Sequence, residues 1–126
     1  THYMRPSSVV KLLNAIGIDN IRNQRILEAG CGTGFLVAHL IRAGASHVIA
    51  TEINDHAITC FPTCRFKDSQ LSLQKESFLN TDIMLEVNVV TQIIGIPELI
   101  DKLLHMFLVN PHVKVVAFVK PRRTSD

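Results

Sequence analysis

Three glycines at alternate positions mark the segment of this chain best suited to chemistry. Residues 28–34 read Glu-Ala-Gly-Cys-Gly-Thr-Gly, and a carboxylate follows eighteen positions after the last glycine, at Glu52. Glycines spaced this closely let the backbone turn sharply and leave room for a ligand against it. A carboxylate at the end of the next strand can accept hydrogen bonds from the hydroxyls of a ribose. The segment therefore predicts a binding site for a ribose-containing ligand.

The glycine spacing also bears on which ligand this is. The pattern here is G-x-G-x-G. Nicotinamide-dependent dehydrogenases carry G-x-G-x-x-G instead, with glycines placed so that the backbone can approach a pyrophosphate. The spacing therefore argues against a dinucleotide cofactor.

The elements that must position these residues alternate between strands and helices. Apolar runs predict strands at residues 24–30, 47–51, 82–90 and 113–119. Helical spacing predicts helices at residues 35–43 and 97–108, a short one from Asp55 to before Pro62, and one near the N-terminus capped by Ser7 or Ser8. Between residues 61 and 80 the alternatives are an irregular strand at 65–66, a strand at 71–74 or a long loop. The alternation predicts an α/β fold, with a parallel sheet of about five strands and flanking helices.

Length and composition are those of an ordinary globular chain. The 126 residues, 47% of them hydrophobic and 19% charged, suit one domain over residues 1–126. No apolar run approaches the ~20 residues of a membrane span, and no signal-like stretch opens the chain, so an intracellular protein of the cytoplasm or nucleus is expected.

Charge and cysteine content say little about partners. The net charge of +2 does not by itself indicate nucleic-acid binding. A weak basic patch near the C-terminus can meet an acidic partner; it consists of Lys114, Lys120, Arg122 and Arg123. The three cysteines lack the paired spacing of a zinc site, so no metal is expected.

Residues 25–54 closely resemble the cofactor-binding half of the class I, Rossmann-like, S-adenosylmethionine-dependent methyltransferases. Strand, glycine turn, helix, second strand and acid occur in the same order. The resemblance implies that Glu28 braces the loop and the methionine end of S-adenosylmethionine, and that Glu52 binds its ribose. The other residues that it places at the cofactor here are Gly30, Cys31, Gly32, Thr33, Gly34 and Ile53. The superfamily sheet usually ends in a hairpin for which too few residues follow position 119, so a short, truncated version of the fold is expected.

The predicted strand at residues 82–90 matters most for the methyl acceptor. In methyltransferases the fourth strand ends at the reactive methyl, which implies that Asn88 lies at the mouth of the site with Glu86, Thr91 and Gln92. Asn88 is therefore the candidate catalytic residue, holding the methionine end or the incoming amine. The N/D-P-P-Y/F element that DNA and RNA amino-group methyltransferases carry at this place is absent.

Two protein-lysine families resemble the chain better, and the first is the non-SET histone-lysine methyltransferases of the telomeric-silencing type. Their V-N-N element is matched by residues 87–88, with Val89 in place of the second Asn. Further similarities are Tyr3 and Pro6 before the first helix, Lys120-Pro121 after the last strand, and Glu76-Ser77-Phe78 in place of G-D-F. This resemblance implies that Ser77 and Glu76 contact the adenine amino group and that Phe78 stacks on the adenine ring. It also implies a protein substrate, a histone-type lysine. The seven-strand lysine methyltransferases are similar at residues 82–91, with Asn88 for an acid and Thr91 for a tyrosine.

Two other functions stay open. The departures at Ser77, Val89 and Thr91 fit a non-catalytic binding module, in which the glycine-rich fold persists and the acceptor side is degraded. The second alternative is a small-molecule or RNA methyltransferase.

Overall fold

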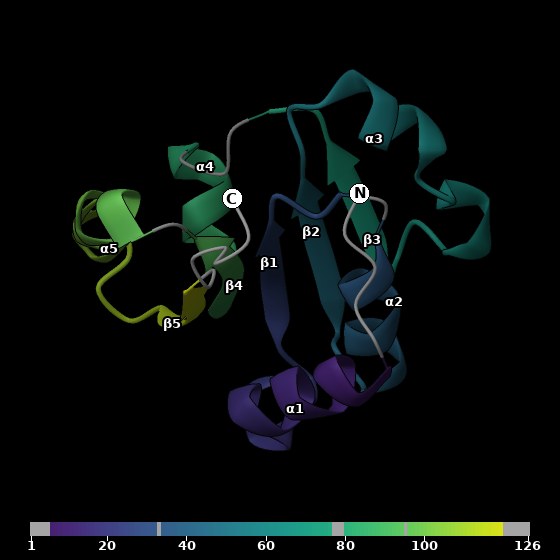
Figure 1. Cartoon of the computed structure of the whole chain (residues 1–126), viewed down its shortest axis with the longest axis horizontal. Helices are drawn as coiled ribbons and strands as arrows, with labels where there is room; N and C mark the ends of the chain where they lie inside the picture. The colour runs from purple at the N-terminus through teal and green to yellow at the C-terminus, as the bar shows by residue number, and fades with distance from the viewer. Residues whose placement is uncertain (1–5, 33, 77–79, 95, 120–126) are drawn as a thin grey trace, which may run out of the picture.

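Five parallel strands form one sheet in the order β3-β2-β1-β4-β5 (Figure 1). The structure is a computed structural model, and it describes residues 6–32, 34–76, 80–94 and 96–119. The strands are β1 (Arg25–Ala29), β2 (His47–Thr51), β3 (Leu71–Gln74), β4 (Val89–Ile94) and β5 (Lys114–Val119). The helices are α1 (Pro6–Ile16), α2 (Phe35–Arg42), α3 (Asp55–Cys60), α4 (Thr81–Leu85) and α5 (Ile96–Val109), with 3-10 turns η1 (Ile18–Asn20) and η2 (Thr63–Arg65). The predicted α/β fold, a five-stranded parallel sheet with flanking helices, is confirmed.

The register of the strands brings several loops to one edge of the sheet. Ala29, the last residue of β1, lies opposite Thr51 of β2 and Gln92 of β4. Thr51 in turn lies opposite Gln74, the last residue of β3. Because the strands are parallel, the segments that follow them leave the sheet at the same edge, which is where ligands bind in open α/β sheets.

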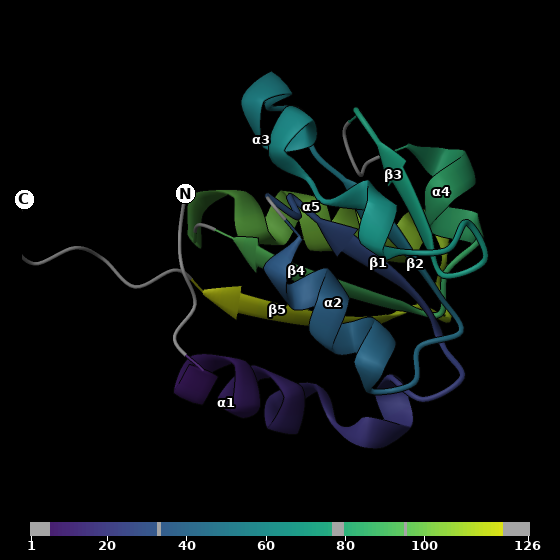
Figure 2. The same cartoon turned by 90° about the vertical axis from the view of Figure 1, so that its right-hand side faces the viewer.

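Helices cover both faces of this sheet (Figures 1 and 2). On one face, α1 and α2 pack on the strands through a cluster that includes Val37 and Leu40. On the other face, α4 and α5 contribute Met84 and Met106 to a second cluster. Two covered faces explain why β1 and β2 each bury four of their five residues. In the described ranges, no helix is long and apolar enough to cross a membrane.

Most elements predicted from the sequence are confirmed. The strands at 24–30, 47–51 and 113–119 and the helices at 35–43 and 97–108 form within one residue of those bounds. Of the alternatives for residues 61–80, the strand at 71–74 is the one that forms. The helix caps are the exceptions. Asn54, one residue before Asp55, caps α3 by accepting from the Ala57 N–H at 2.9 Å, and α1 begins at Pro6, so Ser7 and Ser8 lie inside the helix.

The predicted strand at residues 82–90 is wrong. Thr81–Leu85 form helix α4, and strand β4 begins only at Val89. The Asn80 side chain starts the helix by accepting hydrogen bonds from two backbone N–H groups of its first turn. The strand is therefore displaced toward the C-terminus, which changes the position of every residue assigned to its end.

Candidate functional site

The loop between β1 and α2 holds its three glycines in the left-handed region. The φ angle is 67° at Gly30, 58° at Gly32 and 87° at Gly34, values that other residues rarely adopt. A Cβ atom added at Gly30 or Gly32 would meet no atom within 4 Å, so both positions face open space. A Cβ at Gly34 would lie 2.4 Å from a ring carbon of Phe61. The first two glycines therefore form an open cradle, and the third lets α2 begin against a buried ring.

Glu52 connects this loop to the end of β2. Its Oε1 atom accepts a hydrogen bond from the Gly32 N–H at 2.9 Å. Its Oε2 atom accepts from the N–H groups of Ile53 and Asn54, at 2.9 and 3.0 Å. The structure thus brings the predicted acid and the predicted glycine loop together at the carboxyl edge of the sheet.

Glu28 lies beneath the loop, with only 5% of its surface exposed. The Thr91 hydroxyl of β4 donates a hydrogen bond to its carboxyl group. Burial raises the pKa of Glu28 to about 8, and the hydrogen bond from Thr91 offsets part of that shift. At neutral pH most Glu28 side chains are therefore protonated, and Glu28 joins β1 to β4 as a neutral group.

Replacing Glu28 with glutamine is expected to remove a pH dependence of folding stability. The unfolded side chain ionises near pKa 4.5, whereas the folded one keeps its proton up to about 8. Between these values the unfolded chain binds fewer protons, so the free energy of unfolding falls as pH rises, by at most about 1.4 kcal/mol per pH unit. Urea unfolding at about pH 5 and about pH 7.5 should give a shallower loss of stability for Glu28→Gln than for the wild type. Equal losses in the two proteins would show that Glu28 is not a buried neutral acid.

Cys31 shapes the loop as a protonated thiol. Burial raises the pKa of Cys31 to about 12, together with the negative charges that Glu28 and Glu52 both carry at the high pH where the thiol ionises. Its N–H donates to the Thr51 carbonyl at 3.0 Å, and its own carbonyl accepts from the Gly34 N–H at 3.0 Å. Cys31 therefore holds the loop against β2 through its backbone, and its thiol is unsuited to act as a nucleophile at neutral pH.

The remaining predicted cofactor residues follow the strand ends. Ile53, next to Glu52, is 72% exposed and offers an apolar surface beside the acid. Thr33, Ser77 and Phe78 lie outside the described residues. Glu76, which directly precedes Ser77, accepts a hydrogen bond from Asn80 Nδ2 at 3.0 Å. Among the described residues, no three His, Cys, Asp or Glu side chains come together in a way that would hold a metal ion.

Asn88 lies at the opposite edge of the sheet from the glycine loop. Its N–H donates to the Arg25 carbonyl at 2.8 Å, and its Oδ1 accepts from the Arg25 N–H at 3.1 Å. Arg25 begins β1, whose far end is about 13 Å away at roughly 3.3 Å per residue. Asn88 is therefore not at the mouth of the site, and the prediction that placed it there is wrong because β4 begins only after it. Glu86 lies at the same distant edge, where its Oε2 atom is 3.7 Å from Nη2 of Arg25. Gln92, by contrast, pairs with Ala29 near the carboxyl edge.

One side chain that shapes the site was misplaced in the prediction from the sequence, and another was missed. Thr91, expected at the mouth, is instead fully buried opposite Glu28. Phe61, which follows α3, lies against Gly34. A correct start for β4 would have placed Thr91 opposite Glu28, but no local pattern indicates the contact of Phe61 with the loop.

Comparison with known proteins finds similarity only at the level of structure. No family model matches the chain, and no curated protein matches it in sequence. A dimethyladenosine transferase from Plasmodium falciparum superposes with a TM-score of 0.74 at 20% identity, over 95% of this chain and 43% of that one. A candidate RNA methyltransferase from Pyrococcus horikoshii gives a TM-score of 0.69 at 18% identity, over 98% of this chain and 65% of that one. A candidate S-adenosylmethionine-dependent methyltransferase from Listeria monocytogenes gives 0.63 at 17% identity, over 88% and 52%.

These likenesses show the fold. It is the Rossmann-like fold of class I methyltransferases. The chain spans less than two thirds of the length of each of the three proteins.

Proposed function

We propose that the chain binds S-adenosylmethionine at the carboxyl edge of its sheet and forms the cofactor-binding core of a methyltransferase. The observation that carries this proposal is the open cradle of Gly30 and Gly32 beside the carboxylate of Glu52. The glycines let a ligand approach the backbone closely, and the acid provides acceptors for ribose hydroxyls. The cofactor has no pyrophosphate, in keeping with the G-x-G-x-G spacing.

The Glu52 carboxylate can accept hydrogen bonds from two ribose hydroxyls when one of its backbone hydrogen bonds gives way. A carboxylate offers about four acceptor positions, and three of them take the N–H groups of Gly32, Ile53 and Asn54. Two ribose hydroxyls need two positions, so one backbone bond must be shared or released. The bond to Gly32 is the one we expect to change, because the bonds to Ile53 and Asn54 are local to Glu52.

The other residues of the site hold the cofactor in place. Ile53 supplies an exposed apolar surface on which the adenine ring can pack. Glu28, neutral and bonded to Thr91, fixes β1 against β4 beneath the cradle. When bound, S-adenosylmethionine supplies a methyl group on a positively charged sulfur. The contribution of the chain is to position that group for in-line transfer.

Replacing Glu52 with alanine is expected to weaken S-adenosylmethionine binding by roughly tenfold or more, since hydrogen bonds to a charged group contribute about 1.5–3 kcal/mol. Isothermal titration calorimetry measures the change. Glu86→Ala is the matched control, because it removes an exposed carboxylate at the opposite edge of the sheet. Unchanged affinity in Glu52→Ala would remove Glu52 from the cofactor site.

The protein-lysine acceptor stays a prediction from the sequence resemblance. Fewer residues support this acceptor than the sequence indicated. Asn88 lies at the amino edge of the sheet, where the strands begin, and Tyr3, Lys120 and Pro121 lie outside the described residues. RNA is a second candidate, favoured by the descriptions of the Plasmodium and Pyrococcus proteins as a dimethyladenosine transferase and a candidate RNA methyltransferase. Transfer of a labelled methyl group to histones, nucleosomes or total RNA decides between these acceptors. Binding of the cofactor without transfer to any of them would favour the non-catalytic module.

A further inference from the structure

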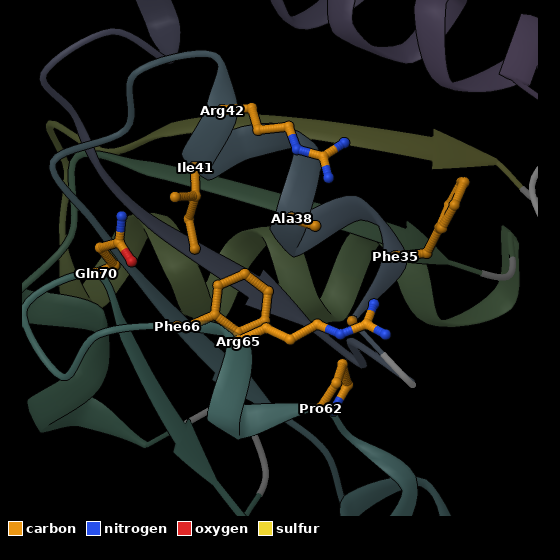
Figure 3. Close-up of a pocket in the computed structure, with 9 residues that line it drawn as sticks. Phe35, Ala38, Ile41, Arg42, Pro62, Arg65, Phe66 and Gln70 are labelled. Carbon is orange, nitrogen blue, oxygen red and sulfur yellow. The ribbon is translucent and has the colours of Figure 1, made fainter.

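A cleft of about 390 Å³ runs along the outer surface of α2 (Figure 3). It lies between that helix and the segment from Pro62 to Gln70. Residues of one side of α2, among them Ala38 and Ile41, form one wall. Gly34 also lines the cleft, so the cleft reaches the last glycine of the cofactor loop.

Two arginines give the cleft its charge. Arg42 comes from the end of α2 and Arg65 from η2 on the opposite wall, and Figure 3 shows both guanidinium groups directed toward the same end of the cleft. Within the described part of the chain, neither arginine forms an ion pair, and no residue lining the cleft is acidic. The planar guanidinium group matches the geometry of phosphate oxygens, so an unneutralised pair favours a phosphate-bearing ligand.

An aromatic ring and an amide complete the lining. The half-buried Phe66 ring lies between Ile41 and Arg65 in Figure 3, and it packs on Phe61 with ring centroids 6.1 Å apart. Gln70 Oε1 accepts a hydrogen bond from the Lys67 N–H at 3.0 Å, and its amide Nε2 has no hydrogen-bond partner among the described residues. The cleft therefore combines a ring for stacking with a donor for a base edge.

We infer that this cleft binds single-stranded nucleic acid, with phosphates on Arg42 and Arg65 and a base against Phe66. Positively charged grooves with aromatic rings are the general means of holding single strands. The volume lies in the range of ordinary ligand pockets and suits one nucleotide of a longer strand. An acidic peptide would satisfy the arginines but would leave the Phe66 ring without a planar partner. The further assignment of this cleft as the surface that holds the methyl acceptor rests on the proposed function.

Fluorescence anisotropy with a labelled oligouridylate of about 12 nucleotides tests this inference. We expect Arg42→Gln and Arg65→Gln each to weaken binding by roughly tenfold. Each change should also make the fall of the logarithm of affinity with the logarithm of salt concentration shallower, by about 0.7 in the magnitude of the slope. Arg22→Gln is the matched control, because it removes an exposed arginine outside the cleft and should leave binding unchanged. A single-stranded DNA of equal length shows whether the 2′-hydroxyls contribute.

The outcomes separate this inference from the proposed function. If the cleft binds nucleic acid, Arg42→Gln and Arg65→Gln keep the wild-type affinity for S-adenosylmethionine, and Glu52→Ala keeps the wild-type affinity for the oligonucleotide. Wild-type oligonucleotide affinity in both arginine variants would overturn the inference. So would arginine-dependent binding of an oligoglutamate peptide in place of the oligonucleotide. A chain that binds the oligonucleotide and not S-adenosylmethionine would overturn the proposed function and leave the cleft as a nucleic-acid site.

Discussion

Replacing Gly34 with alanine is expected to lower the free energy of unfolding by about 2–5 kcal/mol. The φ angle of 87° costs an L-residue about 1–2 kcal/mol. The new Cβ would also lie 2.4 and 2.5 Å from two ring carbons of Phe61, an overlap that costs about 1–3 kcal/mol. Phe61 is only 5% exposed and belongs to the core beneath α2, so the ring has little room to move away.

A double-mutant cycle separates these two causes. In a Phe61→Leu background the ring atoms nearest to Gly34 are gone, so Gly34→Ala should cost only the backbone strain of about 1–2 kcal/mol. Urea unfolding of the four proteins gives the coupling free energy. The same cost for Gly34→Ala in both backgrounds would show that the ring does not restrict this position.

Replacing Gly32 with alanine is expected to weaken S-adenosylmethionine binding by roughly 5- to 150-fold while the chain stays folded. The added Cβ meets no protein atom within 4 Å, so it projects into the space that we assign to the cofactor. Forcing one extra carbon into a filled site costs about 1–3 kcal/mol, which corresponds to that loss of affinity. Calorimetry gives the affinity, and thermal unfolding confirms that the variant is folded.

Gly44→Ala is the matched control for both glycine variants. Gly44 has a φ angle of 104°, and its added Cβ would make only an ordinary contact of 3.5 Å with Arg22. It lies after α2, beside the chain entering β1, and away from the glycine loop. The control therefore carries backbone strain but should keep the wild-type affinity for the cofactor. An equal loss of affinity in Gly44→Ala and Gly32→Ala would contradict the cradle.

The half of the chain that carries the glycine loop could be predicted from its sequence because its signals are local. A short strand-like segment with Ile26, Leu27 and Ala29 before a glycine turn indicates a strand, and the spacing after Gly34 indicates a helix. Glu52 follows the next apolar run directly, so its arrival at the same edge follows from the parallel order of the strands.

The region around residues 82–90 could not be read in the same way, because a short apolar run fits a buried strand and a buried helix equally well. The buried residues Ile83, Met84 and Val87 are spaced as on one face of a helix. Asn80 followed by Asp82 in the first turn is also a helix start signal. Together these signals favour a helix before Asn88 and a strand that begins after it, which places Asn88 at the amino edge of the sheet.

The features that no local pattern indicates are contacts between distant segments. Glu28 and Thr91 are 63 residues apart, and their hydrogen bond depends on the register of β1 and β4. The cleft likewise depends on how the segment after α3 packs against α2, which brings Arg42 and Arg65 to facing walls. Such arrangements are set by tertiary packing, which the order of residues along one element does not specify.

Isothermal titration calorimetry of the wild-type chain with S-adenosylmethionine tests the central proposal most directly. We expect saturable heat from one site, a weaker signal from Glu52→Ala and Gly32→Ala, and no heat with a nicotinamide dinucleotide. No heat with S-adenosylmethionine, together with saturable heat from the dinucleotide, would contradict the cofactor site described at the carboxyl edge of the sheet.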